Sequence, residues 1–508
     1  MAANSLYPAL KYEVSQGIWD AKETLDETNF YSQKQGSPSE LTKTITYVLG
    51  DYNRSYPLSS MTVGGEGYGN SGSAKELDDV QFTYPVMGRD DKVSRISATA
   101  YQGGDKPGIG NGEFEATFED NWIKRFYIIR SERGTRAYVL SAGEPVPGGY
   151  KYRLKLDPAG PTDSCPLDQL AVGTRWVELF TLVPESESRT TESKMAMPGM
   201  FKNQMGFMRT GMSWAGNSAN KVMKIDMVDA NGQKSNVWMD YFMWQFEKRW
   251  MSDCEHYYWY SQYNRATDGT IALKDMLTGK VIPQGSGVLE QIANKSTYSE
   301  LTYNILANKI GDALYGLSDS ANFSLTLMGG TGARREFHRA VMGAGGKILT
   351  NLGGAGDIGS KFITGSGYNL ALGGYFDTIY HIDGYTIKFK YNAVFDHGRV
   401  AMVSPKHPKS GLPLESYRMV FIDDADVEGQ PNIQHVAQKG RSFMHGVIKG
   451  LTPMPRSLRI MNGLDDKDIN SNLLSTDMDK SSYTRFKSAG IQILRANRCF
   501  DMTCTAGL

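Results

Sequence analysis

The chain has 508 residues, enough for about three domains, and a formal net charge of zero, because 55 lysines and arginines balance 55 aspartates and glutamates. Proteins held on nucleic acid by phosphate contacts usually carry a basic excess, so dedicated nucleic-acid binding is disfavoured. Four scattered cysteines are too few for a disulfide framework, which suggests a reducing compartment. The N-terminal segment lacks the features of a secretion signal and no run of about 18 apolar residues occurs, so we expect neither secretion by that route nor a membrane span.

Residues 1 to about 75 are typical of an extended arm with one short helix. The segment 37–40, Ser-Pro-Ser-Glu, forms a capping box with proline at the first helical position. A narrow apolar stripe at helical spacing follows it. One helix of that size cannot form a core, so we expect this arm to depend on contacts elsewhere.

The segment 80–157 is typical of successive β-strands. Apolar residues alternate with polar ones over 114–118 and again over 150–156, and the turn-rich tips 103–112 and 141–149 reverse the chain. The pattern predicts a long hairpin without a core of its own. Because two-stranded ribbons are marginal in water, we expect its apolar face to be buried on another body, and we favour a neighbouring subunit over its own domain.

Six methionines then fall between 195 and 212, which suit either loops and core gaps or a subunit contact. The strongest helix pattern covers 236–260, with Ser235 or Asn236 as the N-cap. Aromatic residues occupy more than one side of this helix, so we expect it to be buried on more than one face.

From 285 to 440 the pattern alternates helix and strand. Thr297 and Glu300 form a capping box that predicts a helix over 297–316. A strand at 323–327 leads through a glycine turn into a helix near 333–342, and an Asp-Gly pair predicts a hairpin across 379–391. Further short strands are predicted at 491–494 and around residue 500.

No glycine motif has the context that a nucleotide site requires. Residues 354–359 match the GxGxxG dinucleotide fingerprint, but the residues after Gly359 cannot form the helix that must face the pyrophosphate. Gly332 lacks the Lys-Ser/Thr pair of a phosphate loop. We therefore interpret both as glycine-rich turns.

Metal binding and catalysis have no signature either. The seven histidines never stand three or four residues apart, and neither HExxH nor GxSxG occurs. Cys499 and Cys504 have no nearby histidine, which favours buried thiols over zinc. The aspartates at 423–426 could hold a hard cation, but we favour a solvated acidic loop. We predict no catalytic, cofactor-binding or metal-binding residues, and no cofactor.

Four segments together resemble the major capsid proteins of crAss-like and related tailed bacteriophages, which have the Hong Kong 97-like capsid fold. TYPVMGRDDKVS (83–94) resembles the entry to the family's extended loop, and SNVWMDYFMWQFEKRWMSDCEHYYWYSQYN (235–264) resembles its aromatic spine helix. SLTLMGGTGARREFHRAV (324–341) is similar to a strand, turn and helix of the axial domain, and SSYTRFKSAGIQILRANRCFDM (481–502) to the closing strands of the peripheral domain.

The resemblance implies an α+β fold with an N-terminal arm, an extended β-hairpin (E-loop), a peripheral domain with a long spine helix, an axial domain, and insertions within 140–230 and 400–480. The expected boundaries are the arm at 1–75, the E-loop at 76–160, the peripheral domain at 161–284 with the spine helix 236–260 and an insertion, the axial domain at 285–440, and a return to the peripheral domain at 441–508.

The implied function is structural and not enzymatic: self-assembly into hexamers and pentamers of the icosahedral head shell around the double-stranded DNA genome. Neutral charge fits, because it avoids self-repulsion as copies converge. Expected partners are the chain itself, portal, auxiliary or decoration and head-fibre proteins, and DNA only non-specifically, with no membrane. The expected location is the virion, after assembly in the bacterial cytoplasm. The alternatives are another virion protein of tail, collar or decoration, or, less favoured, a nucleotide-dependent enzyme.

Six basic residues in the predicted hairpin are candidates for contact with acidic residues of a neighbouring subunit. They are Arg89, Lys92, Arg95, Arg130, Arg133 and Arg136. Replacing Arg133 and Arg136 with glutamate is expected to block particle formation while leaving the subunit folded.

Overall fold

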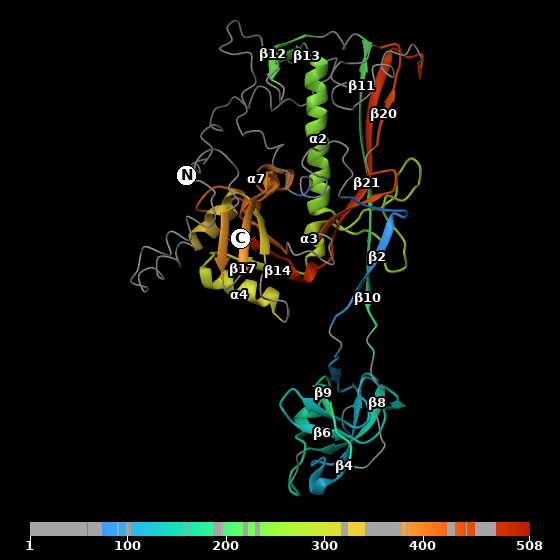
Figure 1. Cartoon of the computed structure of the whole chain (residues 1–508), viewed down its shortest axis with the longest axis vertical. Coiled ribbons are helices and arrows are strands. Elements are labelled where there is room, and N and C mark those ends of the chain that lie inside the picture. Colours follow the sequence, from blue (N-terminus) through green and yellow to red (C-terminus); the bar gives the residue numbers. More distant parts are fainter. Residues whose placement is uncertain are drawn as a thin grey trace, which may run out of the picture. The chain divides into compact units, whose positions relative to one another are not determined.

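The structure is a computed structural model of the chain (Figure 1). It describes residues 58, 74–88, 91–97, 101, 103–157, 160–185, 195, 197–216, 222–228, 234–315, 324–340, 378–382, 385–423, 432–442, 444–452 and 474–507. The chain divides into unit 1, residues 1–82 and 203–508, and unit 2, residues 83–202. The predicted arm helix and the segment 354–359 lie outside the described residues. None of the described helices combines the length and apolarity that crossing a membrane requires.

Unit 2 is built around a seven-stranded antiparallel sheet with the strand order β3-β9-β5-β6-β8-β4, and β7 pairs with β8. The strands are β3 (Ser94–Arg95), β4 (Glu113–Phe118), β5 (Tyr127–Ser131), β6 (Arg136–Val139), β7 (Glu144–Val146), β8 (Gly149–Leu156) and β9 (Arg175–Thr181). The two alternating runs of the sequence are β4 and β8, and they pair with each other as predicted.

The prediction that this segment lacks a core of its own is wrong. One face of the sheet buries a cluster of apolar residues. The strands that contribute to it are β4, β5, β6, β8 and β9. Trp176 of β9 is 1% exposed and packs edge-on against Phe118, with ring centroids 6.4 Å apart. Cys165 and Leu170 complete the cluster. These residues follow the segment that shows the alternation, which is why the hairpin pattern did not reveal them.

The turn between β7 and β8 requires glycine. Gly149 has a φ of +155°, a conformation that side chains disfavour. A Cβ at this position would collide with the carbonyl oxygen of Phe118 on β4. Glycine therefore lets β4 and β8 begin their pairing directly at the turn.

Unit 1 contains a six-stranded mixed sheet with the order β14-β22-β18-β15-β17-β16. Its strands are β14 (Asn294–Tyr298), β15 (Ser324–Gly329), β16 (Thr378–Ile382), β17 (Tyr385–Tyr391), β18 (Met419–Asp423) and β22 (Phe500–Cys504). The predicted strand near 323–327 and the predicted hairpin across 379–391 are confirmed by β15 and by the antiparallel pair β16 and β17.

This sheet is buried on both faces. All five residues of β18 are buried, and successive side chains of a strand point to opposite faces. Phe421 belongs to a cluster with residues of α4 (Tyr303–Leu314) and of the helix 331–340, whereas Val420 and Ile422 belong to a second cluster. The second cluster contains Phe395 of α7 (Ala393–His397) and residues of the long helix α2. The sheet is therefore the middle layer of unit 1.

Unit 1 also contains a five-stranded sheet in which β21 is central. The order is β1-β19-β21-β11, and β20 pairs with β21 beside β19. The strands are β1 (Ala74–Leu77), β11 (Gly206–Ala215), β19 (Ile433–Gln438), β20 (Met444–Ile448) and β21 (Lys480–Ile493). The predicted short strand at 491–494 is the end of β21, whose first half was missed because it carries charged residues that are nevertheless buried.

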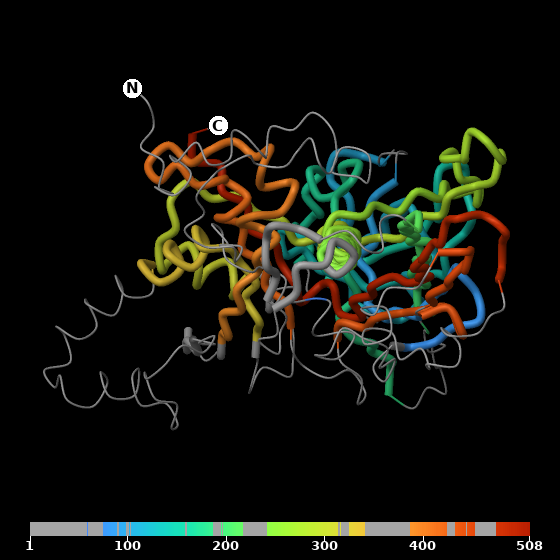
Figure 2. The backbone as a smooth tube through the Cα atoms, turned by 90° about the horizontal axis from the view of Figure 1, so that it is seen from above, coloured from blue at the N-terminus to red at the C-terminus, as the bar shows by residue number. Residues whose placement is uncertain are grey.

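Helix α2 (Trp238–Tyr260) packs against both sheets of unit 1. Trp250, Cys254 and Trp259 belong to the cluster on the six-stranded sheet. Met243 belongs to a separate cluster with Trp214 of β11 and residues of β21. Figure 2 looks along α2, drawn end-on in green, between these two groups of strands. The predicted burial on more than one face is confirmed.

Two predicted helix starts are displaced. α2 begins at Trp238 and not at 236, because 234–237 forms β13 (Lys234–Val237), paired with β12 (Val222–Val228). Thr297 lies in β14, opposite Thr503, so it does not cap a helix. The N-cap of α4 is Thr302, whose hydroxyl accepts a hydrogen bond from the amide of Ile305.

The remaining elements are short. They are β2 (Gln81–Val86), which pairs with β10 (Gly199–Gln204), the helices α3 (Val288–Gln291) and α8 (Arg399–Val403), and the 3-10 turns Ile109–Asn111, Leu167–Gln169, Leu414–Tyr417 and Ala496–Arg498. Among the methionines, Met205 and Met212 are buried, while Met195 and Met197 are exposed.

Trp176→Ala tests the core of unit 2. Loss of a buried tryptophan should cost about 3–5 kcal/mol of unfolding free energy, and the hydrogen bond from Nε1 to the carbonyl of Gln169 is lost as well. Hydrogen exchange on the full chain should show faster exchange in β4 and β8. Val172→Ala, at a residue that is 55% exposed, is the control. Unchanged protection in the tryptophan variant would contradict a core of this kind.

Candidate functional site

Of the six predicted contact residues, two already have acidic partners in the same chain. Nζ of Lys92 lies 2.9 Å from Oδ2 of Asp120, and Arg133 forms an ion pair with Asp168. Exposed pairs of this kind contribute at most about 1 kcal/mol, so their main effect is to neutralise local charge. Arg89 lies outside the described residues.

The other three lie on strands of unit 2, together with a fourth arginine. We call Arg95, Arg130, Arg136 and Arg175 the arginine face. Arg95 of β3 stands opposite Arg175 of β9. Arg130 of β5 stands opposite Arg136 of β6. Arg130 also stands opposite Val177, two residues beyond Arg175, so the two pairs are neighbours on the side of the sheet away from Trp176.

The pairing on the arginine face is unfavourable for the isolated sheet. Like charges directly opposite each other on neighbouring strands destabilise a sheet. Among the described residues, the carboxylate of Glu132 alone forms an ion pair with this face, 3.0 Å from Nε of Arg175. A guanidinium binds planar anions such as carboxylates through two parallel hydrogen bonds. The face is therefore suited to bind anionic groups.

The neighbouring strands β4 and β8 show the opposite arrangement. Glu115 stands opposite Arg153, and Glu113 stands opposite Lys155. Two ion pairs result, Lys151 with Glu115 at 3.2 Å and Arg153 with Glu113 at 3.5 Å. Cations and carboxylates on this part of the sheet therefore compensate each other, in contrast to the arginine pairs of β3, β9, β5 and β6.

Sequence reasoning missed Arg175. The residue lies beyond the segment 80–157 that shows strand alternation, and its position opposite Arg95 depends on the pairing of two distant strands. The signal that could have found it is the run 175–181, in which Arg, Val and Leu alternate with Trp, Glu and Phe.

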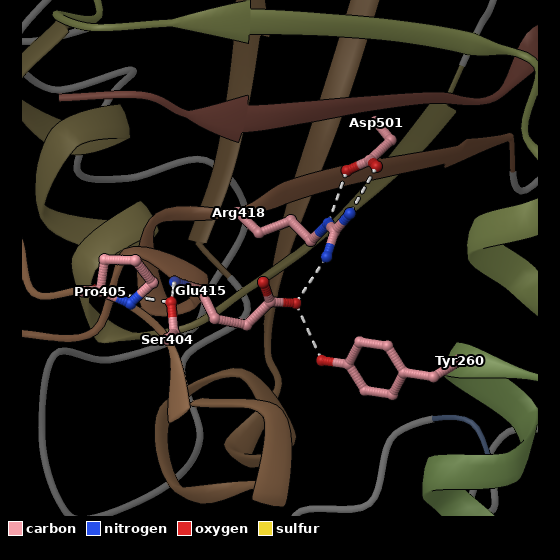
Figure 3. Close-up of polar contacts among 6 residues, drawn as sticks. All are labelled: Tyr260, Ser404, Pro405, Glu415, Arg418 and Asp501. Carbon is pink, nitrogen blue, oxygen red and sulfur yellow. Dashed lines mark hydrogen bonds and ion pairs between the residues drawn. The ribbon is translucent and has the colours of Figure 1, made fainter. Parts of the chain in front are cut away.

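A chain of polar contacts joins the end of α2 to the six-stranded sheet of unit 1 (Figure 3). The hydroxyl of Tyr260 donates to Oε1 of Glu415 at 2.8 Å, and Arg418 donates to the same oxygen at 2.6 Å. Arg418 also donates through Nε and a terminal nitrogen to both oxygens of Asp501 of β22, at 3.0 and 3.1 Å. Asp501 is 1% exposed, and the two carboxylates raise the pKa of Arg418 despite its burial.

The other side of α2 faces buried charges on β21. Glu247 and Arg485 form a buried ion pair. Burial raises the pKa of Glu247 to about 7, although Arg485 lowers it. The ammonium of Lys487 lies 5.4 Å from the ring centroid of Tyr258, which is a cation–π contact. These charges hold one register between helix and strand, since any slip would leave a buried charge without its partner.

His435 of β19 lies in the same buried region. Its Nε2 is 2.9 Å from the hydroxyl of Tyr258. Burial, and then the charge of Lys487, lower its pKa well below the ordinary histidine value. The imidazole is therefore neutral in the folded chain at neutral pH.

The glycine turn before the helix 331–340 already holds an anion of its own. Asp396 of α7 accepts hydrogen bonds from the amide of Thr331, at 2.9 and 3.0 Å, and from the hydroxyls of Thr331, Tyr391 and Ser416. The amide of Gly332 donates to Ser416 Oγ at 2.8 Å. A side chain at Gly330 would collide with Asp396. The glycines therefore make room for a protein carboxylate where a phosphate loop would bind phosphate.

No described residues gather into a cluster of three or more metal-ligating side chains. The four cysteines are buried free thiols, as predicted for Cys499 and Cys504. Burial raises the pKa of Cys165 and of Cys254 to about 11, so neither is a thiolate at neutral pH.

Comparison with known proteins assigns the chain to a class and then to a family. The model of the Crassvirus major capsid protein family matches residues 16–506. The class is therefore a structural protein of the bacteriophage capsid shell, and the described residues form a mixed α+β fold. The chain belongs to the Crassvirus major capsid protein family, which confirms the resemblance seen in the sequence.

Solved structures that are similar include the capsid of a native GTA particle, with a TM-score of 0.34, 7% identity and coverage of 95% of this chain and 100% of that chain. The capsid of Myoviridae phage XM1 has a TM-score of 0.30 and 10% identity, covering 64% of this chain and 82% of that chain. The SrpI encapsulin complex of Synechococcus elongatus has a TM-score of 0.28 and 8% identity, covering 62% and 77%. No curated protein matches. The family match over residues 16–506 carries the assignment.

The Glu247–Arg485 pair predicts a strong non-additive effect. Arg485→Met leaves a buried carboxylate without its partner and should cost about 3–5 kcal/mol of unfolding free energy. Adding Glu247→Met removes the stranded charge, so the double variant should recover most of that loss. Urea unfolding followed by tryptophan fluorescence of the unassembled subunit measures both. Simple addition of the two single effects would contradict the ion pair.

His435 predicts acid sensitivity. A neutral buried histidine with a lowered pKa stabilises the fold above the ordinary value of 6.5, and this contribution is lost as the pH falls below it. The urea midpoint of the wild type should therefore fall more steeply between about pH 7 and pH 5 than that of His435→Gln. His338→Gln, at an exposed histidine, should behave like the wild type. Parallel curves for the wild type and His435→Gln would refute a buried neutral imidazole.

Proposed function

We propose that this chain is the major capsid protein that self-assembles into hexamers and pentamers of an icosahedral head shell around double-stranded DNA, without catalysis. The observation that carries the proposal is the match of the Crassvirus major capsid protein family over residues 16–506. Zero net charge supports it, because subunits that converge in large numbers then experience no long-range mutual repulsion.

The proposed division of labour follows the family pattern. Residues 1–75 form the N-terminal arm, 76–160 the E-loop, 161–284 and 441–508 the peripheral domain, and 285–440 the axial domain. Helix α2 shares buried apolar contacts with both sheets of unit 1 and an ion pair with β21. These contacts support the proposal that, within unit 1, the peripheral and axial domains form one rigid body.

The proposed contacts between subunits use the basic residues of unit 2. The candidates for binding acidic residues of neighbouring copies are Arg89, Lys92, Arg95, Arg130, Arg133 and Arg136, of which Lys92 and Arg133 also have acidic partners in their own chain. Arg130 and Arg136 stand opposite each other, whereas cations on the adjoining strands β4 and β8 form ion pairs with glutamates. This arrangement supports the role, because charged groups at interfaces determine the partner and the register of binding. Portal, auxiliary or decoration and head-fibre proteins would join the shell in the bacterial cytoplasm, and DNA would be enclosed without specific contacts.

Arg133→Glu combined with Arg136→Glu should abolish particle formation. Arg133 is exposed and Arg136 is half-buried, and neither side chain belongs to the apolar cluster of unit 2. Charge reversal at Arg136 creates repulsion where attraction is proposed, and reversal at Arg133 adds to it by leaving Asp168 without its partner. Negative-stain images of the purified chain should show closed shells for the wild type and none for the variant, with unchanged circular dichroism. Rings or tubes from the wild type would instead indicate a tail or collar component.

A further inference from the structure

We infer that the arginine face of unit 2 is a binding surface for a cluster of carboxylates on a second copy of this chain. The inference rests on the proposed function and makes it more specific, because it separates the basic residues that bind a neighbour from those that are neutralised within their own chain. It also adds Arg175, which the sequence did not indicate.

The arrangement of the arginines is costly for the isolated sheet. The two arginine pairs are neighbours offset by two residues along β9, and each pair places like charges on directly opposite positions. Such pairs weaken a sheet, and Glu132 supplies the single ion pair that the described residues make to this face. An anionic partner would supply a carboxylate to each arginine pair. Binding would therefore remove the repulsion between like charges that destabilises the isolated sheet.

The charges of unit 2 are segregated. Residues 83–202 contain equal numbers of acidic and basic residues. The positive face therefore results from segregation within a neutral unit, since β4 and β8 form two ion pairs between their cations and glutamates, whereas Arg175 is the one member of the arginine face with an ion pair among the described residues. Segregation of this kind produces a local patch that matches a patch of opposite charge over a short range.

The side chains of the arginine face also restrict the chemistry of the partner. All four positions carry arginine, whose planar guanidinium binds carboxylate or phosphate through two hydrogen bonds. A phosphate polymer is the less suitable partner, because binding to nucleic acid depends on a basic excess and this chain has a net charge of zero. A second copy supplies carboxylates in the required number, since acidic residues equal basic residues along the chain.

The partner assignment divides the predicted residues into two groups. Arg95, Arg130 and Arg136 belong to the binding surface. Lys92 and Arg133 do not, because Asp120 and Asp168 already neutralise them within the chain. All of these residues carry the same charge. Arg95, Arg130 and Arg133 are exposed while Arg136 is half-buried, so Arg133 is the matched control for Arg130 in particular.

The test compares charge reversals in the full chain. Arg130→Glu and Arg136→Glu, singly, should raise the subunit concentration required for assembly by about tenfold or more, and Arg175→Glu should act in the same direction. Arg133→Glu should leave that concentration within about twofold of the wild type. Light scattering and sedimentation measure assembly, and circular dichroism checks that each variant is folded.

Equal effects of Arg133→Glu and Arg136→Glu would overturn the inference while leaving the shell proposal intact. A wild type that forms no shells would overturn the shell proposal itself. Assembly of the wild type that requires added DNA, and that Arg136→Glu abolishes by preventing DNA binding, would assign the face to phosphate and also overturn the inference.

A second measurement identifies the partner directly. Arg136→Lys keeps the positive charge and supplies an amine that a carbodiimide can join to a carboxylate at contact distance, with loss of water. Isotope-labelled variant subunits are assembled with unlabelled wild type, and mass spectrometry then reads the cross-links. Cross-links of mixed isotope from residue 136 support the inference. Cross-links confined to one chain contradict it, and the 2.9 Å pair of Lys92 with Asp120 provides the internal positive control.

Discussion

The structure of unit 1 depends on the burial of α2 against two sheets at once. Its aromatic residues fill one cluster on the six-stranded sheet and another on the five-stranded sheet. Because the helix is continuous over 23 residues, the two sheets cannot move independently without breaking one of these contacts. The polar contacts follow the same plan: Tyr260 ties the helix end to Glu415 and Arg418 on one side, and Glu247 pairs with Arg485 on the other. Apolar burial supplies the stabilisation, and the buried charges fix the register.

Local patterns predicted much of the fold. Alternation over 114–118 and 150–156 indicated β4 and β8, and aromatic residues at helical spacing indicated α2. The predictions that were wrong concern residues whose structure depends on partners distant in sequence. Thr297 resembles a helix cap, yet pairing with β22 makes it part of a strand. The first half of β21 contains Arg485 and Lys487, which hydropathy assigns to the surface, although α2 buries them.

The candidate site shows the same limit. Arginines in a strand-rich segment could be picked out by charge alone, but the register that sets Arg95 against Arg175 could not be read from local sequence. The assumption that all six basic residues are equivalent was also a consequence of reading charge without geometry. Asp120 and Asp168 lie close in space to two of them, and that proximity separates neutralised cations from available ones.

The carboxylate of Asp396 in the turn at 330–332 has a consequence for what that turn can bind. Nucleotides and other phosphates bind at helix starts that have free amides. A carboxylate attached to the same polypeptide is always present at high effective concentration and cannot be diluted away. This part of the subunit is thus kept in one state, whatever phosphate compounds surround it.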